Sequence, residues 1–370
     1  MTEGAGLYVH VPFCRGKCRY CGFYSTVQED WLPAYVEALL REAHLFRDRF
    51  TVFDTLYVGG GTPSLMSAPL FRRMLRGLRS RFVYAEDCEV TLEVNPEDVS
   101  SDTAALWRDE GITRISVGVQ TLDDVFLTWL GRRHTARRAR EALEILRRFD
   151  CFHLSVDIMY AIPGQSLRRW LGTLREILAF KPEHLSCYEL TVEKRTPLAV
   201  SVRQGRLRMP SEEVLCLFFE RTSDFLQSHG YLHYEISNYA RCQAWVSRHN
   251  GKYWRRVPYL GLGPGAHSFD GRKRWANVRS VPIYVTRLHN GSPCTSFEEE
   301  LSLEQERLEQ LLLGFRTREG VPMDVLGTEE KGLLPAQKAQ AEGLMQIRDG
   351  ALVPTRKGWL VADQLPLLFV

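Results

Sequence analysis

The sequence predicts an α/β fold whose core is a parallel β-sheet. Between residues 6 and 190, six short apolar runs of strand type alternate with segments whose apolar residues recur at helical spacing. Turn-forming residues follow the runs at their carboxyl ends. Such alternation is typical of a parallel sheet with right-handed crossovers, either a (β/α) barrel or an open doubly wound sheet. The pattern alone separates these two forms poorly.

The expected elements follow one another in order. Strands are expected at residues 7–11, 51–58, 89–94, 112–119, 153–159 and 184–190. Helices are expected between them at residues 31–50, 69–82, 101–110, 135–149 and 166–179. The helix at 101–110 begins with Ser and Asp, which are common capping residues. In a barrel, the carboxyl ends of all strands share one face, and active sites are built there.

The remainder of the chain divides into two further regions. Residues 191–300 are less regular, with a long helix expected at 211–229 and then an aromatic, histidine-rich stretch. Beyond residue 300, helices at 303–315 and 335–342 precede a hairpin at 345–353, which turns at Asp349–Gly350, and a last helical segment at 356–365. We therefore expect a barrel core (1–190), a mixed α/β extension (191–300) and a small C-terminal domain of winged-helix type (301–370).

Composition excludes several classes of protein. With 370 residues and 44% hydrophobic residues, the chain can bury a full core, and one large plus one small domain is expected. A net charge of +3 is too small to indicate nucleic acid as a partner. No signal peptide or membrane-spanning apolar run is visible, and nine cysteines, an odd number, do not indicate a disulfide framework. These features predict a reduced, cytoplasmic protein.

The most informative feature is a group of three cysteines within eight residues. Cys14, Cys18 and Cys21 follow the first expected strand with the spacing Cys-x3-Cys-x2-Cys. Three thiolates on one tight loop can hold three irons of a cubane cluster and leave the fourth iron open. A closed zinc site needs a fourth ligand nearby, and the next cysteine, Cys88, is far downstream. A zinc knuckle is the alternative that these residues leave open.

Further polar residues follow the ends of the other expected strands. The glycines of Gly59-Gly-Gly-Thr-Pro-Ser64 would let backbone amides approach a ligand, although a plain turn explains them as well. Glu93, Gln120 and Asp157 end the third, fourth and fifth strands, and Arg132 follows the fourth. A cation, hydrogen-bond acceptors and amide groups suit a dipolar ligand rich in hydroxyl groups. The alternative for each residue is a core hydrogen bond or a surface charge.

The cysteine loop resembles the signature of the radical S-adenosylmethionine superfamily. This resemblance implies a partial (β/α)6 barrel, with a [4Fe-4S] cluster on the three cysteines and S-adenosylmethionine on the open iron. An electron from the cluster would cleave the cofactor to methionine and a 5′-deoxyadenosyl radical. The other motifs resemble, more narrowly, the subfamily of oxygen-independent coproporphyrinogen oxidases and their relatives. That likeness implies contacts to S-adenosylmethionine from Tyr8, Tyr20, Gly60, Gly61, Thr62, Glu93, Gln120, Arg132 and Asp157.

A second motif concerns heme. His249-Asn250-Gly-Lys-Tyr253-Trp254 places aromatic residues four and five positions after a histidine, and His267 follows in a glycine-rich loop. Imidazole is a good axial ligand of heme iron, and aromatic rings stack on porphyrins. On residue chemistry alone, a packed histidine explains either position better. The four residues resemble the His-Asn-x-x-Tyr-Trp hallmark of HemW-type heme chaperones, and the likeness runs from Tyr8 through the C-terminal region.

The resemblance to heme chaperones implies a set of cofactors and partners. The protein would bind heme, a [4Fe-4S] cluster and S-adenosylmethionine, and would pass heme to apo-acceptors such as respiratory-chain enzymes. Flavodoxin or ferredoxin would be the electron donor, and transient membrane association or a homodimer stays open. Two departures separate the chain from the oxidases: only thirteen residues precede Cys14, and Phe23 replaces a cysteine. Both argue against decarboxylation of coproporphyrinogen III, which stays the alternative beside another radical enzyme acting on a porphyrin.

Overall fold

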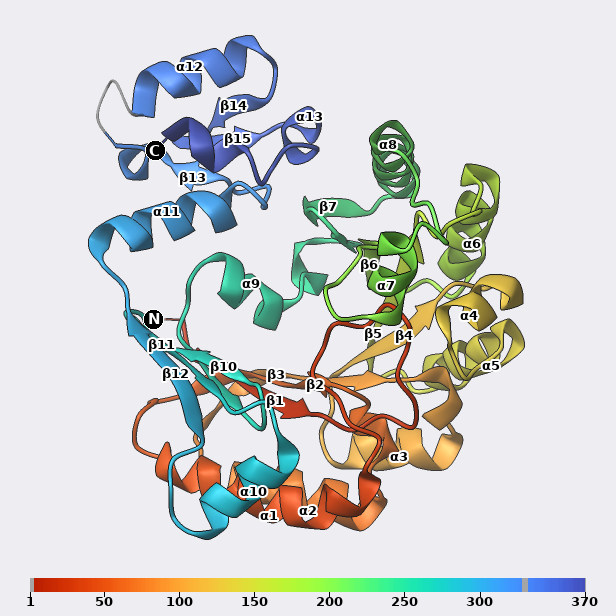
Figure 1. Cartoon of the computed structure of the whole chain (residues 1–370), viewed down its shortest axis with the longest axis vertical. Helices are drawn as coiled ribbons and strands as arrows, with labels where there is room; N and C mark the ends of the chain where they lie inside the picture. Colours follow the sequence, from red (N-terminus) through yellow and green to blue (C-terminus); the bar gives the residue numbers. More distant parts are fainter. Residues whose placement is uncertain (1–2, 328–331, 370) are drawn as a thin grey trace.

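The computed structural model describes residues 3–327 and 332–369, and its core is the expected parallel sheet (Figure 1). Its parallel strands are β1 (Ala5–Val11), β2 (Phe53–Gly60), β3 (Tyr84–Val94), β4 (Arg114–Gln120), β5 (His153–Tyr160) and β6 (His184–Glu189). These strands are neighbours in the sheet in the same order as in the chain. The order never reverses, so the strands are wound in one direction as in a barrel, and the doubly wound alternative is wrong.

Helices follow the strands where the sequence predicts them. They are α1 (Leu32–Leu45), α2 (Ala68–Arg79), α3 (Ser101–Asp109), α5 (Ala136–Arg147) and α6 (Leu167–Ala179). One helix that the pattern missed, α4 (Asp124–Leu130), lies between β4 and α5. It begins at the Asp123 side chain, which caps the Val125 amide, and ends at Gly131, whose φ is +78°. Seven residues are too few to show a helical period, but this helix delivers Arg132 to the carboxyl end of the sheet.

The segment after β6 extends the same sheet at both edges, which the sequence did not predict. Strands β8 (Asn238–Ala240) and β7 (Leu232–Glu235) continue it antiparallel beyond β6. At the other edge, β9 (Tyr259–Leu262) pairs parallel to β1, and β10 (His267–Phe269), β11 (Lys273–Asn277) and β12 (Thr295–Glu300) follow. The helices of this region are α7 (Pro197–Arg203), α8 (Glu212–Ser228), α9 (Arg248–Trp254) and α10 (Val281–His289). The boundaries of the predicted regions remain predictions.

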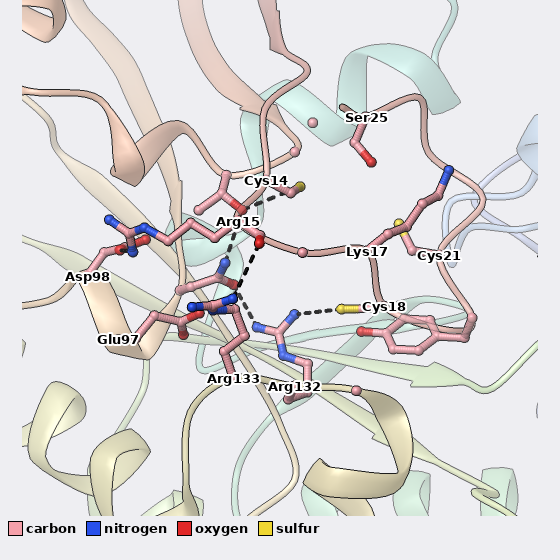
Figure 2. Close-up of a pocket in the computed structure, with 17 residues that line it drawn as sticks. Cys14, Arg15, Lys17, Cys18, Cys21, Ser25, Glu97, Asp98, Arg132 and Arg133 are labelled. Atoms are coloured by element: carbon pink, nitrogen blue, oxygen red, sulfur yellow. Dashed lines mark hydrogen bonds and ion pairs between the residues drawn. The ribbon is translucent and has the colours of Figure 1, made fainter. Parts of the chain in front are cut away.

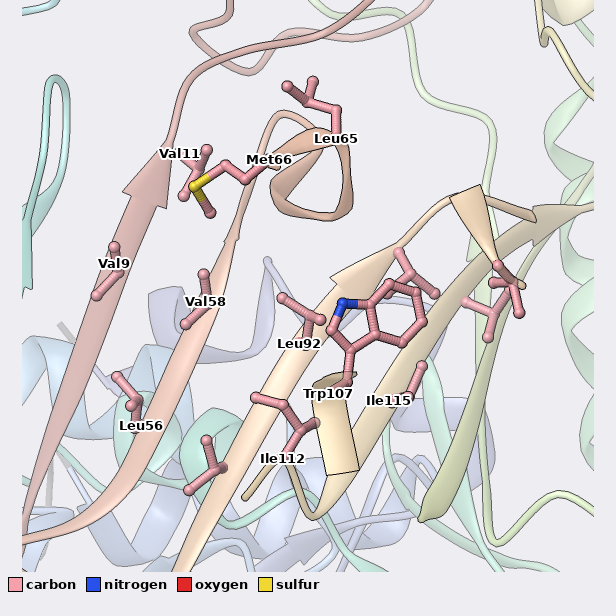
Figure 3. Close-up of a cluster of buried hydrophobic side chains, with 14 of the residues drawn as sticks. Val9, Val11, Leu56, Val58, Leu65, Met66, Leu92, Trp107, Ile112 and Ile115 are labelled. Atoms are coloured by element: carbon pink, nitrogen blue, oxygen red, sulfur yellow. The ribbon is translucent and has the colours of Figure 1, made fainter. Parts of the chain in front are cut away.

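The main hydrophobic core lies between the sheet and its helices. In β1, Leu7, Val9 and Val11 are buried and point toward the helical layer. The corresponding residues of the neighbouring strands and Trp107 of α3 pack in the same layer (Figure 3). The alternate residues of each strand, among them Tyr8, face the opposite side of the sheet, where α9 lies (Figure 1). Because α1, α2 and α10 cover the apolar face, polar chemistry is confined to the α9 side.

The C-terminal region has a smaller core of its own. Its elements are α11 (Leu303–Gly314), β13 (Val321–Pro322), α12 (Leu334–Ala341), β14 (Met345–Arg348), β15 (Ala351–Pro354) and α13 (Arg356–Trp359). The hairpin turn is as predicted, with positive φ at Asp349 and Gly350. The helix expected at 356–365 is wrong in length, because α13 ends at Trp359 and a 3-10 helix occupies Leu365–Phe369. No helix among the described residues is long and apolar enough to cross a membrane.

Candidate functional site

The cysteine loop leaves the carboxyl end of β1 and returns to it. The Cys14 amide donates to the Thr26 carbonyl (2.9 Å), and the Thr26 amide donates to the Pro12 carbonyl (2.7 Å). These two bonds close the loop at its base, and a turn bonds the Cys21 amide to the Cys18 carbonyl (3.3 Å). All three cysteines line one pocket at this end of the sheet (Figure 2). The structure thus brings together the three residues that the spacing predicted to act together.

The arrangement of the three thiols bears on the metal they could hold. Within residues 3–327 and 332–369, no three His, Cys, Asp or Glu side chains converge on the position of a single metal ion. Tetrahedral zinc needs such convergence, whereas a cubane binds each cysteine on a different iron. The lining of the pocket contains no histidine and no fourth cysteine. Three cysteines around one pocket therefore fit a cluster with one open iron better than a zinc knuckle.

The glycine-rich segment after β2 supports the cysteine loop directly. The Gly61 amide donates to the Val11 carbonyl (2.8 Å), and the Thr62 amide donates to the Phe13 carbonyl (2.7 Å). A Cβ at Gly61 would lie only 2.6 Å from the Phe13 carbonyl oxygen, so a larger residue would push the loop away. The expectation that these amides approach a ligand is therefore corrected, because the cysteine loop already accepts their hydrogen bonds. Gly60, Gly61 and Thr62 nevertheless line the pocket.

Polar side chains connect the cysteines across the pocket. Thr62 Oγ1 donates to the Cys14 sulfur (3.6 Å), and the side-chain Nδ2 of Asn95 donates to Thr62 Oγ1 (3.1 Å). The Arg132 guanidinium donates to Asn95 Oδ1 (2.6 Å), to the Gly118 carbonyl (2.9 Å) and to the Cys18 sulfur (3.7 Å). Figure 2 shows Arg132 reaching the pocket opposite the loop. The cysteines and the ends of β2, β3 and β4 thus form one connected network.

Arg132 carries a positive charge into the pocket. The residue is half-buried and lines the pocket, and its Nε, which is itself buried, has no hydrogen-bond partner among the described residues. A carboxylate bound in the pocket would be attracted by the guanidinium charge and could form a charge-assisted hydrogen bond with it. Tyr20 also lines the pocket, and burial raises the pKa of its phenol, which is therefore neutral at pH 7. These two side chains fit a ligand that carries a carboxylate and a flat ring.

Four other predicted cofactor residues do not line this pocket. They are Tyr8, Glu93, Gln120 and Asp157. Glu93 accepts hydrogen bonds from Tyr57 (2.7 Å) and from the Gly60 amide (2.9 Å), and Asp157 accepts one from Ser116 (3.0 Å). Burial raises the pKa of both carboxyl groups, and the charge of Asp157 raises the pKa of Glu93 further. Burial and the charges of both carboxylates also raise the pKa of Tyr57. None of the four belongs to the pocket lining, so their contact with a cofactor stays a prediction.

The remaining two of these four residues, Tyr8 and Gln120, are positioned by different features of the structure. The hydroxyl of Tyr8 is hydrogen-bonded to Nδ1 of His10 (2.9 Å). Gln120 occupies a bulge at the end of β4 with a φ of +64°, a conformation that glutamine rarely adopts. Its amide lies beside Arg132 and Asn95, because a Cβ added at Gly118 would meet all three side chains. The bulge turns Gln120 toward the network of the pocket.

The His249 motif lies on α9, which packs against the amino-terminal parts of the first strands: the His249 amide donates to Glu89, and Lys252 pairs with Asp54 and donates to the Gly4 carbonyl. Nδ1 of His249 is hydrogen-bonded to Thr55 Oγ1 (2.8 Å), and Nε2 is bonded to the Tyr253 hydroxyl (2.9 Å). The residue is buried, and burial lowers its pKa to about 3. Asn250 and Trp254 are half-buried, and Trp254 Nε1 lacks a partner in the described part of the chain. The imidazole therefore has no unengaged nitrogen for iron, and heme binding by the motif stays a prediction.

Sequence reasoning missed several residues that the structure places in the site. Asn95, Glu97, Asp98 and Arg133 line the pocket, and Asn95 connects Thr62 with Arg132. Asn95 directly follows Glu93-Val94 at the end of β3, and a polar residue there could have been chosen by the same rule as Glu93. Asp98 pairs with Arg15 of the cysteine loop and accepts a hydrogen bond from Ser64 (2.7 Å). No sequence signal distinguishes this aspartate from a surface charge.

Comparisons with known proteins agree with this geometry. Residues 8–177 match the radical SAM superfamily, and residues 301–361 match the HemN C-terminal domain. The chain is 36% identical to "Heme chaperone HemW" of Mycobacterium tuberculosis over 97% of this chain and 93% of that protein. It is 30% identical to the Bacillus subtilis protein of the same name over 97% of each chain.

A mammalian relative and a solved structure extend the comparison. "Radical S-adenosyl methionine domain-containing protein 1, mitochondrial" of Mus musculus is 36% identical over 98% of this chain and 86% of that protein. The structure of coproporphyrinogen III oxidase (HemN) from Escherichia coli superposes with a TM-score of 0.82 at 21% identity, over 99% of this chain and 90% of that one. This likeness establishes the shared fold. The chain belongs to the radical SAM superfamily, within its HemN-like branch of HemW-type proteins.

Proposed function

We propose that this protein is a heme chaperone that binds a [4Fe-4S] cluster, S-adenosylmethionine and heme and delivers heme to acceptor proteins in the cytoplasm. The observation that supports the proposal most strongly is its similarity, at 36% identity over nearly the whole chain, to a relative named a heme chaperone. The resemblance covers the barrel, the α9 motif and the C-terminal region together. All nine cysteines are free, which suits a reducing compartment.

Cys14, Cys18 and Cys21 would hold the cluster in this proposal, and Arg132 would bind the carboxylate of S-adenosylmethionine. When bound, the cluster supplies an electron to a ligand on its open iron. The protein side chains position that ligand and exclude water. Arg132 is fixed by Asn95 and by the Gly118 carbonyl before any ligand arrives, so little side-chain entropy is lost on binding. Tyr20 would cover the flat end of the cofactor at the rim of the pocket.

The heme would lie on the α9 side of the sheet. Tyr253 packs edge-on against Tyr259 of β9, with ring centroids 4.7 Å apart, and also bonds His249. In this proposal, His249 fixes Tyr253, and Asn250, Tyr253 and Trp254 contribute to the wall of the heme site. The helix is held firmly, because the buried Lys252 pairs with Asp54 (2.6 Å) and donates to the Gly4 carbonyl (2.7 Å).

Anaerobically reconstituted full-length protein tests the proposal. We expect stoichiometric binding of ferric heme and transfer of that heme to an apo-acceptor such as apo-myoglobin or a heme-free respiratory enzyme. A variant with Ala at all three loop cysteines is the matched comparison for the role of the cluster. An absence of saturable heme binding in the parent protein would refute the proposal.

The same preparation tests the alternative function. Phe23 is 67% exposed beside Cys21, at the position where the oxidases carry a cysteine. We therefore expect no decarboxylation when the protein is incubated with coproporphyrinogen III, S-adenosylmethionine and a reductant. Protoporphyrinogen formed over several turnovers would establish the oxidase instead.

A further inference from the structure

Basic residues are concentrated in two segments of the chain that contain no acidic residue. The cysteine loop, residues 14–26, contains three basic residues, and residues 194–210 contain five. All eight of these residues are exposed. The formal net charge of the whole chain is only +3, so the two segments hold a local excess of positive charge.

The two segments pack side by side. The Leu198 amide donates to the Arg19 carbonyl (2.9 Å), so α7 begins against the cysteine loop. A Cβ added at Gly22 would lie 3.1 Å from Cβ of Glu193, the residue just before the second segment. Figure 1 shows α7, which lies within the second segment, next to the cysteine loop. The exposed residues of the two segments therefore form one surface, which we call the basic face.

The positive charge of the basic face is largely unpaired. Arg15 pairs with Asp98, but the other seven basic residues form no ion pair with an acidic side chain among residues 3–327 and 332–369. Arg133 extends the face, because it is exposed and donates to the Arg15 carbonyl (3.3 Å). Glu193 at the border is exposed too, but a single carboxylate leaves most of this charge uncompensated. Such a surface creates a field that attracts an acidic partner.

Two apolar side chains are exposed beside these charges. Phe23 of the cysteine loop is 67% exposed, and Val27, which directly follows the loop, is 59% exposed. Protein interfaces combine an apolar core with a charged or polar rim. Complexes between electron-transfer proteins are among the smallest, and they bury less than about 1,200 Å². The composition of the basic face therefore suits a protein that docks briefly.

The basic face also covers the three cysteines. Cys14, Cys18 and Cys21 are half-buried and belong to the loop whose outer side forms part of this face. Lys17 lines the cysteine pocket and is exposed, and Figure 2 shows it beside Cys21. A cluster held by these thiols would lie directly beneath the basic face. An electron passes between two proteins only over a short distance, so a donor to this cluster has to dock near the loop.

We propose that the basic face is the docking surface for an acidic one-electron carrier protein, one that contains a flavin or an iron–sulfur centre. The docked, reduced carrier gives up one electron, and the [4Fe-4S]²⁺ cluster accepts it and becomes [4Fe-4S]⁺, while no bond breaks. This inference rests on the proposed function, because it takes the three loop cysteines to hold a cluster. It goes beyond that function by identifying the surface through which the electron enters.

Binding of oxidised flavodoxin, an acidic flavoprotein, to the full-length, cluster-containing protein tests the docking surface without any turnover. The flavodoxin carries a fluorescent label, and its anisotropy is measured. Lys194→Glu/Arg195→Glu is the test variant, since neither residue lines the cysteine pocket. At low salt we expect its dissociation constant to be at least about tenfold above that of the parent, because each charge reversal replaces an attraction by a repulsion. Raising the ionic strength to about 0.3 M should also weaken binding to the parent, because salt screens exposed charges.

The matched control is Arg148→Glu/Arg241→Glu, which changes the net charge by the same amount. Both arginines are exposed and form no ion pair in the part of the chain that the structure describes. They lie at the amino ends of the strands, because Arg148 ends α5 before β5, and Arg241 follows the residue that pairs with the start of β6. We expect this control to bind flavodoxin within about twofold of the parent.

Reduction of the cluster gives a second readout. The second-order rate constant with reduced flavodoxin should fall in the test variant and not in the control, whereas photoreduced deazaflavin, a small reductant, should reduce all three proteins alike.

Three outcomes would overturn the inference while the proposed function stands. In the first, the test variant binds flavodoxin and is reduced by it like the parent. In the second, the test variant and the control lose affinity equally, so that only net charge matters. In the third, a single-stranded oligonucleotide binds the basic face more tightly than flavodoxin does. If the parent holds no iron–sulfur cluster, the proposed function itself fails.

Discussion

Replacing Arg132 by Ala removes the guanidinium group that joins the two sides of the pocket. In the folded protein this group bonds Asn95, the Gly118 carbonyl and the Cys18 sulfur, and it lines the pocket in which a ligand would lie. A hydrogen bond to a charged group contributes about 1.5–3 kcal/mol. If Arg132 binds the carboxylate of S-adenosylmethionine, the dissociation constant should rise by about 10- to 150-fold. Arg132→Lys should recover only part of this loss, because an ammonium group lacks the planar fork of arginine.

The assay measures cofactor binding apart from any turnover. S-adenosylmethionine is titrated against the reduced cluster and followed through the EPR signal, while iron, sulfide and thermal stability are measured on the same samples. Arg137→Ala is the matched control, because Arg137 is a nearby exposed arginine that does not line the pocket. We expect that control to bind the cofactor within about twofold of the parent, since exposed charges contribute little. Parental affinity in Arg132→Ala, with the cluster intact, would refute the assignment of the pocket.

Three other predictions concern the cluster and the stability of the fold. Ala at all three loop cysteines should abolish iron and sulfide binding, whereas Cys151→Ala should not, and stoichiometric zinc in the parent would contradict this. Glu42 is buried and accepts hydrogen bonds from the Gly263 amide, Asn277, Tyr284 and Cys294. Glu42→Ala should lower the free energy of unfolding, measured in urea, by at least about 4 kcal/mol, because each of the four donors left without a partner costs about 1–3 kcal/mol. Burial raises the pKa of Glu235 to about 7, so its stabilising contribution is complete below pH 4.5 and disappears as the pH rises through 7. Glu235→Gln should therefore stabilise the protein at pH 8 by up to about 3 kcal/mol relative to its effect at pH 4.5, and an equal effect at both pH values would argue against a raised pKa.

The sequence predicted those features whose cause is local. Strands with buried faces on both sides produce continuous apolar runs, and all six parallel strands were found within a few residues of their ends. The three cysteines were likewise predictable, because spacing on one tight loop decides whether thiols can share a ligand. Helix α4 escaped detection because seven residues hold no readable period. Strand β9 escaped because its pairing with β1 joins segments about 250 residues apart, and no local pattern records such a contact.

The candidate site was only partly predictable for a related reason. Residue type identified Arg132 as a cation near a strand end, but only the fold shows that Asn95 connects it to Thr62. The glycines of the segment after β2 were correctly located at the site, yet their purpose differs from the expected one. They allow close approach to the backbone of the cysteine loop. A glycine in a sequence can indicate that there is no room for a side chain, but it does not indicate which neighbour occupies that room.

The His249 motif shows that a residue pattern typical of heme binding does not by itself identify the residue that ligates the iron. A histidine followed by two aromatic residues suggests an iron ligand, because imidazole and aromatic rings are the groups that hold heme. In the fold, however, α9 turns His249 into the barrel, where Thr55 and Tyr253 use both ring nitrogens. A Cβ at Gly6 would lie 3.2 Å from the His249 ring, so β1 itself closes over the imidazole. In this fold the hydrogen bonds and packing of His249 account for the residue, and neither of its ring nitrogens is free to ligate iron without breaking one of these bonds.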